Sequence, residues 1–418
     1  MATENDRILC LSDTMEDITR FTQGWPVDFF AISQRNPMDY GGDVFHRQYQ
    51  NLRQQVDLGR IRLVIAEYIE ALPLVHLLRR AGYRCPAIFV PHSNAFPLDN
   101  LALFLLQTTT PHADDVVLCG SDHAVRGYGR LVGLAAKSIC TFGIREVHRE
   151  RLDPKVCRAA LNLPDATPLL LYTGRLMEDK GIRELIQVVA LVRQERPEAR
   201  LVLATTHLTP WYFNELAGGL AGAILFYRLD RQRLVQLYNA ADLFVGCATS
   251  VFETYGKSPL EAIAAGLPAV VPQWDGFPHY MKPSNGLLAK VVFRDQPVET
   301  PYQFAQVDVP DCARQCLEAL GRTECFRPLL PDWGRYDVSV QRIQELVDER
   351  MRAPMQAPGP PGPCPASPGV RLFLEEFQME WPSLTLETLQ NLGILSRREI
   401  GSTGLRRALH GELFSPDS

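Results

Sequence analysis

Short apolar runs alternate with stretches of helical periodicity along the first half of the chain. The runs of strand character cover residues 7–13, 27–33, 62–68, 86–91, 115–121 and 138–144. Between the third and fourth runs, residues 71–82 place apolar side chains at helical spacing, and Gly82 is a plausible C-cap. Strands that alternate with helices predict a parallel sheet covered by helices.

Residues 145–167 are predicted to be a polar connector, and the same pattern restarts near residue 168. Strand-like runs cover residues 168–174, 200–206, 223–227, 242–247 and 268–272. The helix expected between the first two runs carries Ile182, Leu185, Ile186, Val189 and Val192 on one stripe. We therefore predict an α/β chain with two tandem Rossmann-like, doubly wound domains at 1–150 and 151–350. A ligand is expected in the cleft between them, at the carboxyl ends of the strands.

The strand signal fades after residue 295. Residues 309–320 and 337–351 read as the helices that close the second domain. Residues 351–369 contain seven prolines and three glycines, which predicts an extended linker. Residues 370–418 predict a C-terminal helical extension of short amphipathic helices, with Ser396 and Glu399 as a candidate capping box; no role is predicted for this tail.

Composition narrows the class of protein. The 418 residues carry a net charge of −5, which argues against a general nucleic-acid binder. No apolar run reaches 18 residues and the first residues are acidic and polar, so we expect neither a stable membrane insertion nor a secretory signal. Ten scattered cysteines fit a reducing, cytoplasmic compartment. The helically spaced pair Cys312 and Cys316 favours a helix face over a zinc site.

The segment ETYGKSPLEAIAAG, residues 253–266, combines two acidic residues with a helix start. Ser258 followed by Pro259 predicts an N-cap, with Glu261 as the reciprocal arm of a capping box. The backbone N–H groups of Gly256 and Lys257 precede that start and are able to face an anion. Glu253 lies in the loop that follows a predicted strand, on the cleft side.

A second segment, YTGRLMEDKG at residues 172–181, runs from a strand through a glycine into a helix start. Arg175 and Lys180 flank that start, and two cations beside unpaired N–H groups suit a diphosphate that leaves with its charge. A solvated turn with ordinary surface charges is the alternative for this segment taken alone.

Two segments of the first domain are weaker candidates. His92 follows the fourth predicted strand at its cleft-facing end, where a hydrogen-bonded loop residue is the alternative to a catalyst. Gly41 and Gly42 precede a predicted helix, either as a loop that approaches a substrate closely or as a plain turn.

The order of these segments resembles a known family. The chain shows GRLMEDKG, then LVQLYNAADLFVGCA, FETYGKSPLEAIAAGLPAVV, DGFPHYM and SNGLLAK. In this it resembles the retaining GT-B glycosyltransferases of glycosyl transferases group 1, the large family with two glutamates seven residues apart. The resemblance spans roughly residues 60–290 and is strongest over 168–290.

The resemblance implies a nucleoside-diphosphate sugar bound mainly by the second domain, with the first domain on the acceptor side. Arg175 and Lys180 would bind the diphosphate, Glu261 the ribose hydroxyls, and Glu253 would lie near the transferred sugar. His92 matches a histidine near the reacting bond. Further donor contacts would come from Tyr255, Gly256, Lys257 and Ser258, with the base-binding turn around Tyr227 and Leu229.

The implied reaction retains the anomeric configuration by front-face attack, and the leaving phosphate helps to take the acceptor's proton. Arg175 and Lys180 would supply the electrostatic stabilisation, so no metal or other cofactor is expected. The acceptor is expected to be a hydroxyl of a soluble small molecule or saccharide. The donor base, the donor sugar and the oligomeric state stay open.

Four departures from the family pattern keep alternatives open. The only candidate glycine pair follows the second strand instead of the first, and the base-binding turn lacks its usual glycine at Tyr227 or Arg228. His279 stands where a glutamate is usual, and Tyr-Gly-Lys replaces an aromatic-Gly-Leu turn. A sugar phosphorylase, a nucleotide-sugar epimerase and a non-catalytic GT-B scaffold remain alternatives to a transferase.

Overall fold

The structure is a computed structural model that divides into two compact units. The first unit comprises Met1–Thr141 with Val340–Ser418, and the second comprises Phe142–Ser339. Each unit is described by itself. The residues described are 6–12, 21–32, 42–68, 71–93, 112–131, 135–138, 143–250, 252–294, 298, 303 and 305–353.

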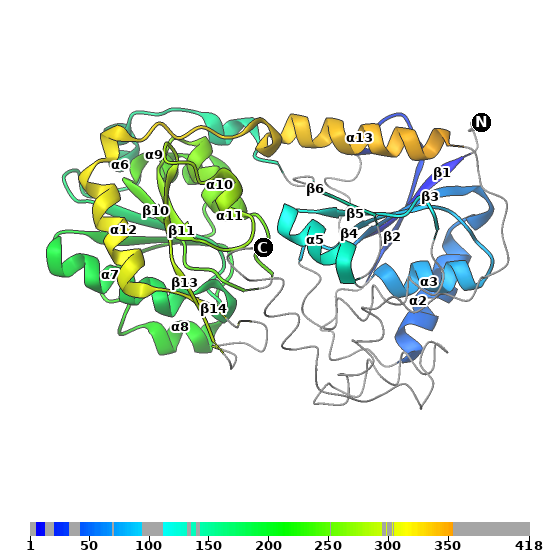
Figure 1. Cartoon of the computed structure of the whole chain (residues 1–418), viewed down its shortest axis with the longest axis horizontal. Helices are drawn as coiled ribbons and strands as arrows, with labels where there is room; N and C mark the ends of the chain where they lie inside the picture. The colour runs from blue at the N-terminus through cyan, green and yellow to red at the C-terminus, as the bar shows by residue number, and fades with distance from the viewer. Residues whose placement is uncertain are drawn as a thin grey trace. The chain divides into compact units, whose positions relative to one another are not determined.

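The first unit is built on a six-stranded parallel sheet (Figure 1). Its strands are β1 Arg7–Ser12, β2 Val27–Ala31, β3 Ile61–Glu67, β4 Ala87–Val90, β5 Val116–Cys119 and β6 Ala135–Ser138. They lie in the order β2-β1-β3-β4-β5-β6. The chain moves from β1 to one side for β2 and to the other for β3, so the topological switch point lies between β1 and β3.

The helices of the first unit are α2 Gly42–Gln55, α3 Leu72–Arg80 and α5 Asp122–Leu131, with a short 3₁₀ turn η2 at Leu58–Arg60. Gly82 follows the end of α3 with a φ of 95°, the left-handed conformation that the predicted C-cap requires. Gly42 begins α2, while Gly41 lies outside the described residues.

The long helix α13, Tyr336–Arg352, completes the core of the first unit. Ile343, Leu346, Val347 and Met351 pack with the buried residues of β1, β3, β4 and β5. Trp25 Nε1 also donates to Asp348 at 2.7 Å. The expected domain boundaries at 150 and 350 therefore differ from the packing, which groups Val340 onward with the first unit because these apolar side chains are buried there.

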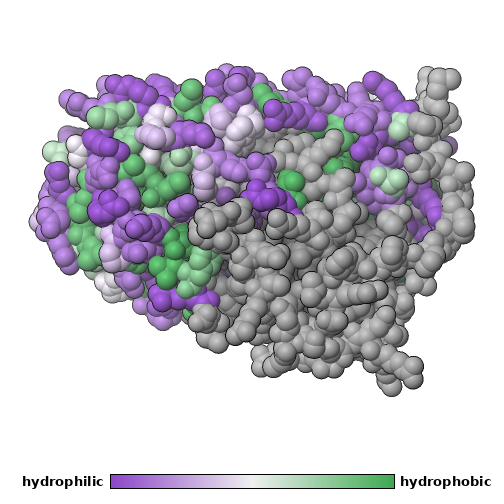
Figure 2. Space-filling model, viewed as in Figure 1, coloured by the Kyte–Doolittle hydropathy of each residue, from purple (hydrophilic) through white to green (hydrophobic). Residues whose placement is uncertain are grey.

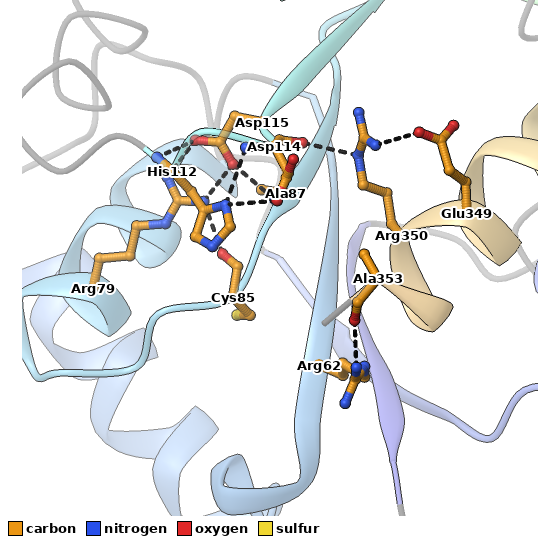
Figure 3. Close-up of polar contacts among 10 residues, drawn as sticks. All are labelled: Arg62, Arg79, Cys85, Ala87, His112, Asp114, Asp115, Glu349, Arg350 and Ala353. Atoms are coloured by element: carbon orange, nitrogen blue, oxygen red, sulfur yellow. Dashed lines mark hydrogen bonds and ion pairs between the residues drawn. The ribbon is translucent and has the colours of Figure 1, made fainter. Parts of the chain in front are cut away.

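A buried ion pair holds the amino-terminal end of the same sheet (Figure 3). Arg79 of α3 donates to both carboxylate oxygens of Asp115 at 2.6 Å, and the two side chains are 4% and 0% exposed. Asp115 also accepts from the backbone of Ala87 and His112. In α13, Arg350 donates to the Asp114 carbonyl at 3.0 Å. These contacts join α3, β4, β5 and α13.

The second unit repeats the architecture with a second six-stranded parallel sheet (Figure 1). Its strands are β7 Leu169–Thr173, β8 Arg200–Thr205, β9 Ile224–Tyr227, β10 Leu243–Val245, β11 Ala269–Pro272 and β12 Gly286–Ala289. The order β12-β11-β10-β7-β8-β9 is that of a doubly wound dinucleotide-type sheet. The switch point lies between β7 and β10, the two neighbouring strands from which the chain moves outward in opposite directions.

The helices of the second unit cover this sheet. They are α6 Pro154–Ala160, α7 Ile182–Glu195, α8 Pro210–Leu216, α9 Arg231–Ala240, α10 Lys257–Ala264, α11 Phe277–Tyr280 and α12 Val309–Gly321, with 3₁₀ turns η4 Glu146–Arg149, η5 Glu178–Lys180, η6 Thr323–Cys325 and η7 Asp332–Gly334. The predicted stripe of α7 is buried apart from Ile186, which is partly buried. Cys312 and Cys316 lie on α12 inside the core, as the helix-face interpretation predicted.

The two predicted parallel sheets are confirmed, and several local predictions are wrong. The sixth strand is Ala135–Ser138 instead of 138–144, and the expected connector at 145–167 contains η4 and α6. We missed β12 and the antiparallel pair β13 Val291–Phe293 and β14 Ala305–Val307, because β12 opens with a glycine and the other two have no apolar run longer than three residues in the sequence. The predicted linker beyond Ala353 and the helical extension at 370–418 lie outside the described residues.

The visible surface of the second unit mixes hydrophilic and apolar residues (Figure 2). Among the exposed apolar side chains are Val292 and Phe293 of β13, and Trp211 of α8. No helix of the described ranges is long and apolar enough to cross a membrane.

Candidate functional site

The candidate site of the second unit lies at the switch point of its sheet, where β7 and β10 end side by side. The loop 174–181 leads from β7 into α7, and the loop 246–256 leads from β10 into α10. In open α/β sheets, ligands bind outside the carboxyl ends of the strands at such a point. Both sequence motifs that suggested an anion site are therefore brought to one edge.

Helix α7 begins at Gly181, which has a φ of 65°. A Cβ at this position would lie 2.3 Å from the Cys247 carbonyl oxygen in the loop after β10, so only glycine fits between the two loops. No side chain caps the helix. The first-turn N–H groups of α7 thus add the positive end of the helix dipole to this edge.

Helix α10 also begins at a glycine, which corrects the predicted capping box. Its N-cap is Gly256, with a φ of 71° and no side-chain cap, so Ser258 lies inside the first turn instead of before it. A Cβ on Gly256 would come within 2.3 Å of Phe277, whose ring packs over the backbone there. Proline is tolerated throughout the first turn, so Pro259 did not fix the start. Glu261 consequently does not cap the helix.

The charged residues of the two loops form a chain of alternating sign. Lys180 Nζ lies 2.9 Å from Glu253 Oε2 and 3.2 Å from Asp179 Oδ2. Asp179 Oδ2 in turn lies 3.6 Å from the half-exposed guanidinium of Arg175. The structure therefore brings together three predicted residues, Arg175, Lys180 and Glu253, through one that we did not predict, Asp179.

Lys180 is a partly buried cation in this series of charges, with 13% of its side chain exposed. Burial alone lowers the pKa of Lys180, but Glu253 and Asp179 outweigh it and leave the pKa raised above the ordinary value. Burial, with the same two carboxylates, also raises the pKa of Tyr172, whose hydroxyl donates to the Arg175 carbonyl at 2.8 Å. The lysine is thus protonated at neutral pH, and its present partners are acidic side chains that an anionic ligand would compete with.

The Glu261 carboxylate is held by a buried tyrosine. Tyr238 of α9, 1% exposed, donates from its hydroxyl to Glu261 Oε2 at 2.8 Å. Burial and then the Glu261 charge raise the pKa of Tyr238 well above its ordinary value, so the hydroxyl stays a donor. Thr173, the last residue of β7, lies 2.6 Å from the same hydroxyl. The chain Thr173–Tyr238–Glu261 fixes the carboxylate to the end of β7.

His148 lies on the other side of the same carboxylate. This residue of η4 is 5% exposed, and its Nε2 lies 3.8 Å from Glu261 Oε1. Burial lowers the pKa of His148, and the opposing effect of Glu261 does not restore it. Its Nδ1 is buried without a hydrogen-bond partner. A neutral imidazole therefore stands beside Glu261, and sequence reasoning had no signal for it because it lies 113 positions away in a predicted connector.

The remaining predicted donor contacts differ in exposure. Tyr255 is buried, Lys257 is exposed and Ser258 is partly buried in the first turn of α10. Tyr227 ends the edge strand β9 and is 49% exposed, with Leu229 partly buried two residues later. These two lie beyond β8 and have no recorded contact with the α7–α10 loops.

Arg228, between Tyr227 and Leu229, takes a φ of 56°. This is the left-handed conformation that glycine adopts most easily, and it occurs in the turn where the family usually has glycine. Its guanidinium lies 5.1 Å from the centroid of the Tyr227 ring. The turn therefore keeps the backbone shape expected of the family while presenting an arginine.

His92 belongs to the first unit and lies just after β4, as predicted. Its Nε2 lies 2.8 Å from Glu67 Oε1, at the end of β3, and its ring packs on Tyr68 with centroids 4.7 Å apart. We did not predict Glu67, since a single acidic residue at the end of an apolar strand carries no motif. Among the described residues, no group of three or more His, Cys, Asp or Glu is arranged to hold a metal ion.

In a comparison with known proteins, residues 155–296 match the model of the family described as glycosyl transferases group 1. A D-inositol 3-phosphate glycosyltransferase of Thermobifida fusca is 34% identical over 131 residues, 28% of this chain and 30% of that protein. A GDP-mannose-dependent monoacylated alpha-(1-6)-phosphatidylinositol monomannoside mannosyltransferase of Corynebacterium glutamicum is 28% identical over 144 residues, 33% and 38% of the two chains. The chain thus matches about a third of the length of such relatives.

Solved structures extend the likeness to the whole fold. Sucrose-phosphate synthase from Thermosynechococcus elongatus has a TM-score of 0.59 at 17% identity, covering 83% of this chain and 96% of that one. The E. coli trehalose-6-phosphate protein bound with UDP-2-fluoro glucose has a TM-score of 0.60 at 13% identity, covering 84% and 100%. At these identities the likeness concerns the fold, which is the GT-B arrangement of two Rossmann-like domains.

Proposed function

We propose that this chain, which through residues 155–296 belongs to glycosyl transferases group 1, transfers a sugar from a nucleoside-diphosphate sugar to a hydroxyl acceptor. The observation that carries the proposal is the position of Lys180. It is a partly buried cation between Glu253 and Asp179, at an edge where α7 and α10 both begin at glycines without a side-chain cap. Such an edge attracts and orients a phosphate group.

The donor diphosphate would compete with the carboxylates of Asp179 and Glu253 for Lys180. Phosphate oxygens accept hydrogen bonds from the N–H groups of the first turns, while Lys180 and Arg175 supply full charges. Because Lys180 is already desolvated, its attraction for a diphosphate is stronger than that of an exposed lysine. Glu253, released from Lys180, would then be available to accept from hydroxyls of the transferred sugar.

Glu261 would accept from the two ribose hydroxyls. Tyr238 donates to one carboxylate oxygen and fixes the plane of the group, and each oxygen retains further acceptor capacity. The nucleobase would lie against the turn at Tyr227 and Leu229. Solved structures of the same fold include the Anabaena HepE protein in complex with UDP-glucose, which supports a sugar nucleotide as the donor class.

We further propose that transfer retains the anomeric configuration and needs no metal ion or other cofactor. The leaving diphosphate would be stabilised by Arg175, Lys180 and the positive ends of α7 and α10, which together do the work of a divalent cation. His92 of the first unit would contact the acceptor side of the reaction. A soluble small molecule or a saccharide is the proposed acceptor, and the eight described cysteines, all free, fit the cytoplasmic location.

Donor binding is the first test. Purified protein is titrated with UDP-, GDP-, ADP- and dTDP-glucose and -mannose, in EDTA and then with Mn²⁺, and thermal unfolding is followed. A sugar nucleotide at 100 times its Kd should stabilise the protein by about 2.7 kcal/mol. Glu261→Ala should abolish most of this shift, while Arg196→Ala, a matched control at the far end of α7, should keep it.

Turnover is the second test. The released nucleoside diphosphate is measured, and the anomeric configuration of the product is read by NMR. Binding of none of these sugar nucleotides by the wild-type protein would overturn the proposed function. Turnover only with Mn²⁺ would overturn metal independence while leaving the donor class intact.

A further inference from the structure

A second buried polar cluster lies at the switch point of the first unit. Ser12 ends β1 and Glu67 ends β3, the two strands that flank that point, and His92 follows the end of β4. Ser12 is 0% exposed and Glu67 is 7% exposed. Ser12 Oγ donates to Glu67 Oε2, and His92 Nε2 lies 2.8 Å from Glu67 Oε1. One carboxylate thus has a different side-chain donor on each oxygen.

The backbone around this cluster is held in an uncommon conformation. Tyr68 and His92 both have positive φ, 64° and 59°, although neither is glycine. Such positions are strained in residues other than glycine; they persist where the surroundings hold them, and they cluster at functional sites. Here Tyr68 N–H donates to the Val90 carbonyl at 2.9 Å, and the Tyr68 ring packs on the imidazole. The strained backbone at Tyr68 and at His92 itself therefore fixes the position of the His92 ring.

The opposite end of the same sheet shows what a purely structural buried charge looks like. There Asp115 is paired with an arginine that neutralises it and with backbone N–H groups (Figure 3). The recorded partners of Glu67 are instead a hydroxyl and an imidazole. Burying a carboxylate without a permanently charged partner costs folding free energy. A neighbouring histidine, whose charge changes near neutral pH, is a partner on which such a carboxylate can act.

The hydrogen bond between Glu67 and His92 determines which imidazole nitrogen carries the hydrogen. An ionised carboxylate only accepts hydrogen bonds, so the hydrogen between the two groups belongs to His92 Nε2. In the neutral ring this makes Nδ1 the nitrogen with the lone pair. A carboxylate that fixes the tautomer and orientation of a histidine is a recurrent device in enzymes and metal sites.

We propose that Glu67 is a positioning residue for the transfer reaction, which holds His92 in the Nε2–H tautomer and in one orientation toward the acceptor. Ser12 supports it by occupying the second carboxylate oxygen. The inference rests on the proposed function, and it adds to it a residue that acts through His92. Glu67 itself need not touch either substrate.

The test uses Glu67→Gln, which keeps the shape but lets the side chain donate as well as accept. Turnover is measured as hydrolysis of whichever of the UDP-, GDP-, ADP- or dTDP-sugars the wild-type protein cleaves. We expect kcat to fall roughly tenfold or more, with the KM for the sugar nucleotide unchanged. Asp28→Asn, at the other end of the same sheet and paired with Arg7 at 2.7 Å, is the matched control and should leave kcat unchanged.

A spectroscopic readout makes the inference independent of turnover. Ring ¹⁵N–¹H correlation spectra report which nitrogen of His92 carries the hydrogen, assigned with His92→Gln. The wild-type protein should show Nε2–H, and Glu67→Gln should change the tautomer distribution. If no sugar nucleotide is bound, the proposed function fails, but the tautomer result still decides the contact between Glu67 and His92.

Two outcomes overturn the inference. One is a His92 spectrum that Glu67→Gln leaves unchanged, and the other is a kcat loss no larger than that of Asp28→Asn. If Glu67→Gln does not fold, Ser12→Ala replaces it, since it frees one carboxylate oxygen while leaving the charge. That variant should lower kcat two- to fivefold or so, with an unchanged KM.

Discussion

The two units carry the same sheet architecture but build their carboxyl edges differently. In the second unit the edge is made largely of backbone, because α7 and α10 both begin at glycines that no other residue fits, and the charges sit in the same two loops. In the described part of the first unit, the edge presents isolated side chains, Ser12, Glu67 and His92, at or just after the ends of three different strands. Backbone donors suit a generic anion, whereas placed side chains suit a particular hydroxyl.

This difference shows which kind of site can be predicted from sequence. Loops that bind phosphate need glycines and cations at fixed spacing, so they leave a contiguous motif. A cluster assembled across strands leaves only single residues. The comparison predicts that damage to the second unit removes donor binding, whereas damage to the first unit's edge removes turnover alone.

The largest effect is expected from removing both cations of the second unit. Arg175→Met with Lys180→Met should lower turnover by roughly 10³-fold or more and weaken nucleoside-diphosphate binding, since each donor at a leaving phosphate contributes about 3 kcal/mol. Binding is measured by calorimetry and folding by thermal unfolding. Full-speed transfer by a folded double variant would contradict the assignment of this edge to the diphosphate.

The next effect concerns stability and contrasts a buried ion pair with a partly exposed one, both at the amino-terminal end of the first unit's sheet. Asp115→Asn leaves the Arg79 guanidinium buried without a counter-charge and should destabilise the protein by about 3 kcal/mol. Asp28→Asn, in a partly exposed pair, should cost about 1 kcal/mol or less. Urea unfolding measures both. Equal costs would contradict the structural role assigned to the buried pair of Arg79 and Asp115.

A smaller effect is expected at Tyr238. Tyr238→Phe removes the donor to Glu261 and should weaken binding of the sugar nucleotide by about 1 kcal/mol, close to fivefold in Kd. The loss should be smaller for the matching 2′-deoxy nucleotide. Tyr212→Phe, another fully buried tyrosine of the same unit, is the control. An equal loss of affinity for the ribonucleotide and the 2′-deoxynucleotide would contradict the proposed contact between Glu261 and the ribose.

The smallest effect is a pH dependence that originates at His148. Burial lowers its pKa in the folded state below the ordinary 6.5, so the unfolded chain binds more protons between the two values. The contribution of the neutral ring is therefore fully present above pH 6.5 and is lost as the pH falls through the folded pKa. Unfolding free energies from pH 7.5 to 5 should fall less steeply for His148→Phe; parallel curves would contradict this.

The elements that the sequence predicted share a long apolar period. The stripe of α7 and the buried runs of β1, β3, β7 and β8 are set by local pattern, and packing did not override them. The failures are elements whose local pattern is weak or whose boundary depends on a distant contact. Strand β12 opens with a glycine, and the start of α10 depends on Phe277 packing over Gly256, which no local rule around Ser258 contains.

The same reasoning divides the candidate site. Arg175, Lys180 and Glu253 were predictable because they follow strands within recognisable loops, and the structure brings them together. Tyr238, His148 and Glu67 were not, because each is a lone residue whose partner is distant along the chain. Their positions depend on which strand ends meet, and that is decided by sheet order.

The return of α13 to the first unit has a consequence for how the protein is made. Ile343, Leu346, Val347 and Met351 belong to the first unit's core but leave the ribosome after the whole second unit. The amino-terminal unit, begun first, is thus finished last, and until then its sheet has one uncovered apolar surface. Cleavage or early termination near residue 340 would leave the described core of the second unit intact. The first unit would lack helix α13.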